Sequence, residues 1–319
     1  MCSVGVCLAG PIRGATSPSA LAQTSGNSML EATKTEPARD ALVMNSMLSL
    51  RACRHGPMMY LRNDMYIGRS FDQYGEYSEG EVEVFRAFLR PGDIALDVGA
   101  NIGALTIPMA QLVGPSGSVY AFEPQRIVFQ ILCGNVALNE LGNVYTLQWA
   151  VGHAAGTTKV APLDYSAQNN FGGLSLGGVK GEDVAVIAID DINLPKLRLI
   201  KMDVEGMELN AIMGAAATIE RCRPILFIEN DRPDKSTALL TQLLNSGYRL
   251  WWHISPLYNS ANFLRNPQNH FGHVHSFNVL GLPSEMNDVR LPLHEITSAD
   301  EGTAYLENTL QRAHVHLNP

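Results

Sequence analysis

Short apolar blocks alternate along the middle of the chain with stretches in which apolar residues recur every three or four positions. Ile94–Val98 is one such block, and Gly99 follows it directly. Its length and composition are typical of a strand that is buried on both faces. Beyond it, the apolar residues of Ile102–Val113 follow helical spacing, and Gly114 ends the run. The pattern therefore predicts a buried strand that turns directly into a helix.

The same alternation continues along most of the chain, which predicts an α/β fold with a largely parallel sheet. Six further blocks read as strands, namely Ser118–Phe122, Val144–Val151, Leu197–Met202, Pro224–Ile228, Tyr248–Ile254 and Val274–Leu280. We expect the last of them to run antiparallel to its neighbours. Two additional strands, Thr157–Leu163 and Val184–Ile189, interrupt the alternation and predict an inserted β-hairpin.

The two ends of the chain differ in composition from its middle. Residues 1–57 contain no Phe, Trp or Tyr, so we expect this segment to be disordered. We place one domain at residues 58–283, and within it residues 58–90 are expected to form a hairpin around Arg62–Asp64 followed by a helix that covers the ligand site. Residues 284–319 are expected to form a polar tail with one amphipathic helix near Ala304–Leu310.

Composition and charge exclude several classes of partner. The formal net charge is −8 and the isoelectric point is about 5.6, and the chain has no basic run, which argues against a nucleic-acid partner. No stretch is apolar enough to predict a membrane span. The five cysteines show no metal-binding spacing, so we interpret them as free thiols in a reducing compartment and expect a cytoplasmic protein.

The turn that follows the first strand is the strongest indication of a ligand site. Asp97-Val98-Gly99-Ala100-Asn101-Ile102-Gly103 joins a strand to a helix through glycines, and such a turn can present unpaired backbone N–H groups to a nucleotide. A dinucleotide fingerprint would need glycine where Asn101 stands. The acidic Asp97 disfavours a pyrophosphate and suits a ligand with an amino group and a sulfonium. Glu123 ends the next strand, where it can accept hydrogen bonds from both hydroxyls of a ribose.

Three motifs together resemble the FkbM family of S-adenosylmethionine-dependent methyltransferases. They are the glycine turn above, Phe122-Glu123-Pro124, and Ile200-Lys201-Met202-Asp203-Val204-Glu205-Gly206-Met207-Glu208. The resemblance covers roughly residues 74–282. It implies a seven-stranded, Rossmann-like methyltransferase sheet with helices on both faces, S-adenosylmethionine as cofactor, and methylation of a hydroxyl oxygen. The acceptor is expected to be a small molecule or a saccharide.

The candidate cofactor-binding residues lie at the carboxyl ends of the predicted strands and in the helix that precedes the first strand. They are Glu79, Asp97, Gly99, Asn101, Gly103, Glu123, Ala150, Val151 and Asp203. The resemblance implies that the segment containing Glu79 closes over the ligand, although helix capping explains this residue equally well. The backbone of Ala150 and Val151 is expected to lie beside the adenine.

Transfer of a methyl group to a hydroxyl also needs a group that takes up the hydroxyl proton. Asp203 is the first candidate, because a carboxylate at the end of an apolar strand needs a partner or a polar cleft. Glu229, His253 and His275 follow it. Asp203 could instead orient the acceptor or bind a divalent metal, but we predict no metal site. The competing hypothesis is a nucleoside-binding module without catalysis, which would not convert the cofactor to its demethylated product.

Overall fold

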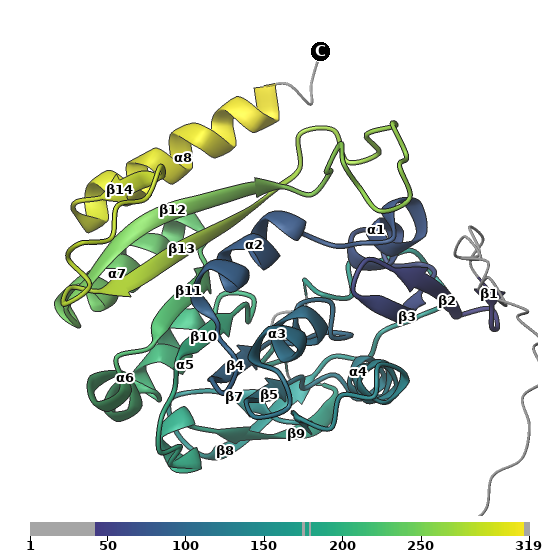
Figure 1. Ribbon diagram of the computed structural model, residues 1–319, viewed down its shortest axis with the longest axis horizontal. Coiled ribbons are helices and arrows are strands. Elements are labelled where there is room, and N and C mark those ends of the chain that lie inside the picture. The colour runs from purple at the N-terminus through teal and green to yellow at the C-terminus, as the bar shows by residue number, and fades with distance from the viewer. Residues whose placement is uncertain (1–41, 174–175, 179, 316–319) are drawn as a thin grey trace, which may run out of the picture. The chain divides into compact units, whose positions relative to one another are not determined.

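A twisted eight-stranded sheet forms the centre of the protein (Figure 1). The computed structural model describes residues 42–173, 176–178 and 180–315. The strand order across the sheet is β14-β12-β13-β11-β10-β4-β5-β6. The strands are β4 (Ile94–Val98), β5 (Ser118–Phe122), β6 (Val144–Leu147), β10 (Leu199–Met202), β11 (Ile225–Glu229), β12 (Tyr248–Pro256), β13 (His275–Pro283) and β14 (His294–Ile296).

The last predicted strand, Val274–Leu280, runs antiparallel to its neighbours, as expected. Strands β6, β5, β4, β10 and β11 run parallel to one another, and β13 is inserted antiparallel between β11 and β12. The expected count of seven is too low by one, because β14 adds an eighth strand to the outer edge of β12. The parallel strands bring their carboxyl ends to one edge of the sheet, which is where open α/β sheets bind ligands.

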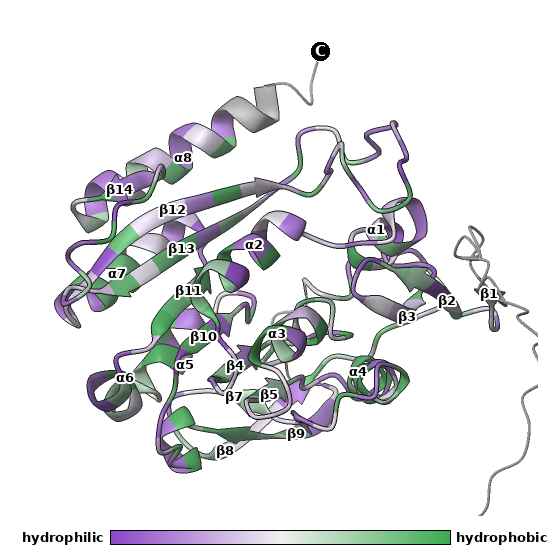
Figure 2. Cartoon of the chain, viewed as in Figure 1, coloured by the Kyte–Doolittle hydropathy of each residue, from purple (hydrophilic) through white to green (hydrophobic). Residues whose placement is uncertain are grey.

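Helices cover both faces of this sheet. Helices α2, α3 and α4 pack on one face, where side chains such as Phe85 and Met109 meet Phe227. Helices α5, α6, α7 and α8 pack on the other face, where Leu240 and Leu306 meet the opposite sides of the same strands. Because β11 is enclosed from both sides, it is coloured hydrophobic along most of its length in Figure 2.

The helices have the following bounds. They are α1 (Ile67–Tyr74), α2 (Glu79–Phe88), α3 (Thr106–Val113), α4 (Arg126–Leu138), α5 (Glu208–Met213), α6 (Ala216–Cys222), α7 (Pro233–Asn245) and α8 (Ala299–Val315), with a 3-10 turn at Ile189–Ile192. In the part of the chain that the structure describes, none of them is long and apolar enough to cross a membrane.

The inserted strands belong to a separate small sheet. Strands β8 (Gly156–Val160) and β9 (Glu182–Ile187) pair antiparallel, as the sequence predicts. Strand β7 (Ala150–Val151), however, pairs parallel with β9. The insert is therefore part of a three-stranded sheet rather than a hairpin alone, and β7 holds it beside the end of β6.

The amino-terminal hairpin lies earlier in the chain than predicted. It consists of β2 (Leu48–Cys53) and β3 (Gly56–Leu61), with β1 (Leu42–Val43) added to β2. The residues after Arg62 and Asn63, which we expected to form the second strand, are instead a turn that leads into α1 (Ile67–Tyr74). The Asp64 carboxylate causes this difference, because it accepts the backbone N–H groups of Tyr66 and Ile67 at 2.8 and 2.9 Å and turns the chain into the helix.

Both expected domain boundaries also need correction. Residues 42–57, which we expected to be disordered, form strands, whereas residues 1–41 lie outside the described part. The supposed tail after residue 283 contains β14 and α8. Helix α8 is held by burial of Leu306 and by a hydrogen bond of 2.9 Å between the hydroxyls of Thr303 and Thr237 on α7. The amphipathic helix expected near Ala304–Leu310 is therefore present, and it extends beyond these residues at both ends.

Asn135 of α4 joins the hairpin to the glycine turn. Its side-chain oxygen accepts the Met59 N–H at 2.7 Å, and its amide group donates to the carbonyls of Met59 and Ile102 at 2.9 and 2.8 Å. The side chain is fully buried. We predict that Asn135→Ala lowers the free energy of unfolding by about 2–4 kcal/mol, because buried backbone groups lose their partners. Denaturant unfolding measures this change. The exposed Asn287→Ala is the control and should stay within about 0.5 kcal/mol of wild type; equal effects would contradict the assignment.

Candidate active site

Two adjoining cavities open at the carboxyl ends of the parallel strands. The large cavity has a volume of about 440 Å³, and the small cavity has about 40 Å³. Gly99, Glu123, Asp203 and Glu205 line both of them. A ligand that fills the two cavities would therefore run past the glycine turn.

The glycine turn is closed tightly against the next strands. Gly99 has a φ of 78°, and a Cβ atom placed on it would lie 1.8 Å from the carbonyl oxygen of Asp203, so no other residue fits. The N–H groups of Gly99 and Ala100 both donate to the Phe122 carbonyl. The Asn101 N–H donates to Glu123 at 3.0 Å. These backbone groups are paired within the protein, contrary to the expectation that the turn presents them to a ligand.

The members of the turn divide into cavity-lining and supporting residues. Gly99 and Asn101 line the large cavity. Gly103 lines neither cavity; it has a φ of 90° and packs against Leu132 on α4. The structure thus places Gly103 outside both cavities, where it allows the backbone to enter α3.

Glu123 lies between the two cavities and is only 3% exposed. One of its carboxylate oxygens accepts the Asn101 N–H and the other accepts the Gln125 N–H at 2.8 Å. Each oxygen keeps lone-pair capacity for a further donor. Burial raises the pKa of Glu123 to about 7. The side chain is thus held rigidly and can still receive the hydroxyl groups of a ligand.

Asp97 is the clearest correction at the site. Its side chain is fully buried and lines neither cavity. One oxygen accepts the Thr106 hydroxyl at 2.6 Å, and the other lies 3.1 Å from the ammonium nitrogen of Lys201 on β10. Lys201 also donates to the Gly99 carbonyl at 2.8 Å. Asp97 therefore supports the turn through Lys201 and does not itself face a ligand.

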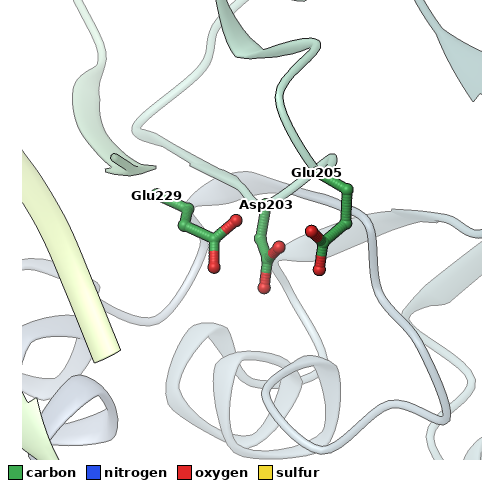
Figure 3. Close-up of side chains that lie close together, drawn as sticks. All are labelled: Asp203, Glu205 and Glu229. Carbon is green, nitrogen blue, oxygen red and sulfur yellow. The ribbon is translucent and has the colours of Figure 1, made fainter. Parts of the chain in front are cut away.

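Three carboxylates meet at the ends of β10 and β11 (Figure 3). Asp203, Glu205 and Glu229 offer oxygens within 4.8 Å of one another, an arrangement that could hold a divalent cation. Burial and the neighbouring carboxylates raise the pKa of Glu229 well above its ordinary value. Burial and Asp203 raise the pKa of Glu205 to about 7, although Arg232 contacts its carboxylate. The cluster can therefore hold and exchange a proton near neutral pH.

The small cavity has an apolar lining. Ala150 and Val151 border it, together with Trp149 and Pro124. Glu123 and Asp203 lie at its junction with the large cavity. Its lining and position suit a flat heterocycle whose attached ring reaches Glu123.

Two further candidates point away from both cavities. The carboxylate of Glu79 lies 2.9 Å from His55 and 3.7 Å from Arg54 of the hairpin. Glu81 faces inward instead, where the Ser78 hydroxyl donates to it at 2.8 Å. Positions 79 and 81 are about 200° apart around a helix. Ser78 donates to this carboxylate and makes no side-chain bond to the backbone at the start of α2.

His253 is the second of these candidates. Its ring packs edge-on against Phe227 at 5.3 Å, on the sheet face that α2 covers. Burial lowers the pKa of His253, which favours a neutral ring. It lines neither cavity, so the structure does not bring it together with Asp203 and Glu229.

Several cavity residues escaped the sequence analysis. Tyr66, Tyr77 and Leu257 form walls of the large cavity, and Lys201 and Arg232 supply its cations. Burial and nearby carboxylates, Glu81 first, raise the pKa of Tyr77 well above its ordinary value, so its phenol stays neutral. Lys201 stood inside the third motif and could have been found there, since a lysine in a buried strand needs a charged partner.

A third cavity of about 410 Å³ lies between α5 and α7. Leu209, Met213 and Lys235 line it, and it shares Asp231 and Arg232 with the large cavity. None of the predicted site residues borders it. The chemistry described above therefore belongs to the first two cavities.

Strand order, glycine turn and acidic strand ends together define the class of nucleoside-binding α/β methyltransferases. Residues 97–250 match the family model of the methyltransferase FkbM domain. This part of the chain is thus similar to the methyltransferase FkbM domain, in agreement with the resemblance of its motifs, and S-adenosylmethionine is the cofactor that this similarity supports.

Three relatives illustrate this similarity. The hexuronic acid methyltransferase AglP of Haloferax volcanii is 26% identical over 149 residues, which are 44% of this chain and 59% of the relative. The methyltransferase sdnD of Sordaria araneosa is 28% identical over 156 residues, 37% of this chain and 59% of the relative. The 31-O-demethyl-FK506 methyltransferase FkbM of Streptomyces tacrolimicus is 25% identical over 238 residues, 64% of this chain and 86% of the relative.

The chain therefore spans about 59% of the length of the first two relatives. Among solved structures, methyltransferase FkbM from Methylobacillus flagellatus KT aligns with a TM-score of 0.42 and 19% identity, covering 63% of this chain and 50% of that one.

We predict that Gly99→Ala abolishes measurable binding of S-adenosylhomocysteine, the demethylated cofactor, because the added Cβ would displace the Asp203 backbone. Calorimetry measures the binding and circular dichroism reports the fold. Gly142→Ala is the matched control, since a Cβ there meets nothing within 4 Å. If Gly99→Ala bound the ligand as well as this control, the close approach of the turn to Asp203 would be refuted.

The raised pKa of Glu123 predicts a pH dependence of stability. Its folded-state value of about 7 exceeds its ordinary value of 4.5, so the folded protein binds more protons than the unfolded chain between these values. The contribution of Glu123 to the free energy of unfolding is fully present below about pH 4.5 and is lost as the pH rises through about 7. This loss lowers the free energy of unfolding by about 1–3 kcal/mol. Glu123→Gln should lose less stability than wild type between pH 5 and pH 8 in denaturant unfolding. Identical pH dependence in both proteins would contradict the burial argument.

Proposed function

We propose that the protein is an S-adenosylmethionine-dependent methyltransferase that transfers a methyl group to a hydroxyl oxygen of a small molecule or saccharide. The observation that carries this proposal is the position of Asp203. It lines both cavities, beside Glu123 on one side and Glu229 on the other. A carboxylate at the junction of a nucleoside site and an open cavity is placed where an acceptor hydroxyl would meet the cofactor.

The residues present fit the cofactor. Gly99 leaves the turn without a side chain where a Cβ atom would collide with Asp203, and Glu123 keeps acceptor capacity for ribose hydroxyls. The apolar lining around Val151 and Trp149 suits the adenine. When bound, S-adenosylmethionine supplies an electrophilic methyl group on a sulfonium.

The chain's own residues orient the acceptor and remove its proton. Asp203 accepts the hydroxyl proton, and Glu229 lies close enough to share it. The raised pKa of Glu229 supports a carboxylate that takes up a proton readily, so the proton can move from Asp203 to Glu229. The walls formed by Tyr77 and Leu257 restrict water, which strengthens the electrostatic interactions inside the cavity.

The lining of the large cavity supports a polyhydroxylated acceptor. Tyr66 and Tyr77 present aromatic side chains, and the carboxylates of Asp203, Glu205 and Glu229 are acceptors for hydroxyl groups. The relative that is a hexuronic acid methyltransferase supports a saccharide. A nucleoside-binding module without catalysis is less favoured, because such a module would not need three adjacent carboxylates beyond the ribose site.

We predict that Asp203→Asn lowers single-turnover methyl transfer by about a hundred- to ten-thousandfold and leaves the melting temperature nearly unchanged. The acceptor is first identified by screening polyols with labelled cofactor. Asp234→Asn, which borders only the third cavity, is the control and should transfer normally. Near-normal transfer by Asp203→Asn would exclude Asp203 as the base and leave Glu229.

A further inference from the structure

The large cavity has an unequal distribution of charge. Five carboxylates line it, namely Glu123, Asp203, Glu205, Glu229 and Asp231, whereas its Lys and Arg residues are Lys201 and Arg232. Arg232 already contacts the carboxylates of Glu205 and Asp231. A ligand that carries a carboxylate would be repelled by most of this surface and would need the remaining cation.

Lys201 has hydrogen-bonding capacity that its protein contacts do not use. It projects from β10 and is 4% exposed. An ammonium group has three N–H bonds. Among the described residues, the contacts of its ammonium are the Gly99 carbonyl at 2.8 Å and the Asp97 carboxylate at 3.1 Å. These leave one N–H, and the residue borders the large cavity directly below the glycine turn.

Lys201 stays protonated although its side chain is buried. Burial alone would lower its pKa, but the carboxylates of Asp97 and Asp203 outweigh this effect and raise the pKa above its ordinary value. An ammonium with an unused N–H in a buried position favours an anionic ligand atom, since leaving that donor unpaired is costly.

We propose that Lys201 binds the carboxylate of the cofactor's amino-acid end through this remaining N–H, in addition to supporting the turn through Asp97 and Gly99. The inference rests on the proposed cofactor. The five carboxylates of the cavity would repel the ligand's carboxylate, so this group is assigned to Lys201. The ligand's ammonium group is assigned to the carboxylates.

The test compares two ligands that differ only in that group. S-adenosylhomocysteine carries the carboxylate, and its decarboxylated analogue, S-adenosyl-3-thiopropylamine, lacks it. Calorimetry measures both dissociation constants for wild type and for the double variant Asp97→Asn/Lys201→Met. The double variant removes the buried pair as a unit, so that no buried charge is left without its partner. Asp97→Asn/Lys201→Gln is the second variant, in case the first does not fold.

Wild type should bind S-adenosylhomocysteine at least about tenfold more tightly than the analogue, as expected for one charge-assisted hydrogen bond. In the folded double variant this preference should fall to within about threefold. Arg232→Gln is the matched control, because it removes the other cation of the cavity, and it should keep the wild-type preference.

Two results would overturn the proposal. If the double variant loses affinity for both ligands equally, Lys201 only shapes the glycine turn. If the preference disappears in Arg232→Gln and not in the double variant, the carboxylate binds at Arg232. If the wild-type protein binds neither ligand, both the proposed function and this inference are overturned. In the first two results the wild type still binds, so only the inference is overturned.

Discussion

The contact between Asp97 and Lys201 is the interaction on which the rest of the site depends. It joins the neighbouring strands β4 and β10 at the same register position. Through Lys201 it also fixes the carbonyl of Gly99. The turn held in this way places the Asn101 N–H against Glu123 and brings Gly99 against the backbone of Asp203. Breaking one partner of such a buried pair typically costs about 3–5 kcal/mol, so the geometry of the site is coupled to the stability of the sheet.

The core and the flanks of the domain contribute different parts of the site. The segment that matches the family, residues 97–250, contains the glycine turn, Glu123 and the three clustered carboxylates. The walls of the large cavity at Tyr66, Tyr77 and Leu257 come from outside that segment. In the proposed function, the strand ends bind the cofactor and the flanking segments shape the space left for the acceptor. A change of acceptor could accordingly arise in the flanks without disturbing the turn.

Hydrogen bonds to Glu76 fix the wall of the large cavity that contains Tyr77. Glu76 is 3% exposed and accepts hydrogen bonds from Arg54 at 2.6 Å, from the Asn259 amide at 2.8 Å and from the Phe263 N–H at 2.8 Å. One carboxylate thus ties the hairpin, the segment before α2 and the loop after β12 together. This network holds Tyr77 in place beside the acidic cluster.

The sequence predicted what depends on periodicity and on strand ends. Apolar blocks located the parallel strands, and Glu123 and Asp203 were found because each follows a strand directly. The direction in which side chains point was harder to predict from the sequence. A shift of one position along a helix or strand moves a side chain to another face, and the sequence pattern did not show which face lines the cavities. Glu79 and His253 were therefore predicted at the site, whereas the structure places both outside the two cavities. Asp97 was misassigned because its partner, Lys201, is about a hundred residues away, and only the pairing of β4 with β10 brings the two together.

A crystal structure of the protein with S-adenosylhomocysteine tests the central claim most directly. The account predicts that the ribose hydroxyls contact the Glu123 carboxylate, that the adenine lies against Val151 and Trp149, and that the thioether sulfur points toward Asp203. Electron density for the ligand in the cavity between α5 and α7, with Glu123 contacting only the backbone of Asn101 and Gln125, would contradict it.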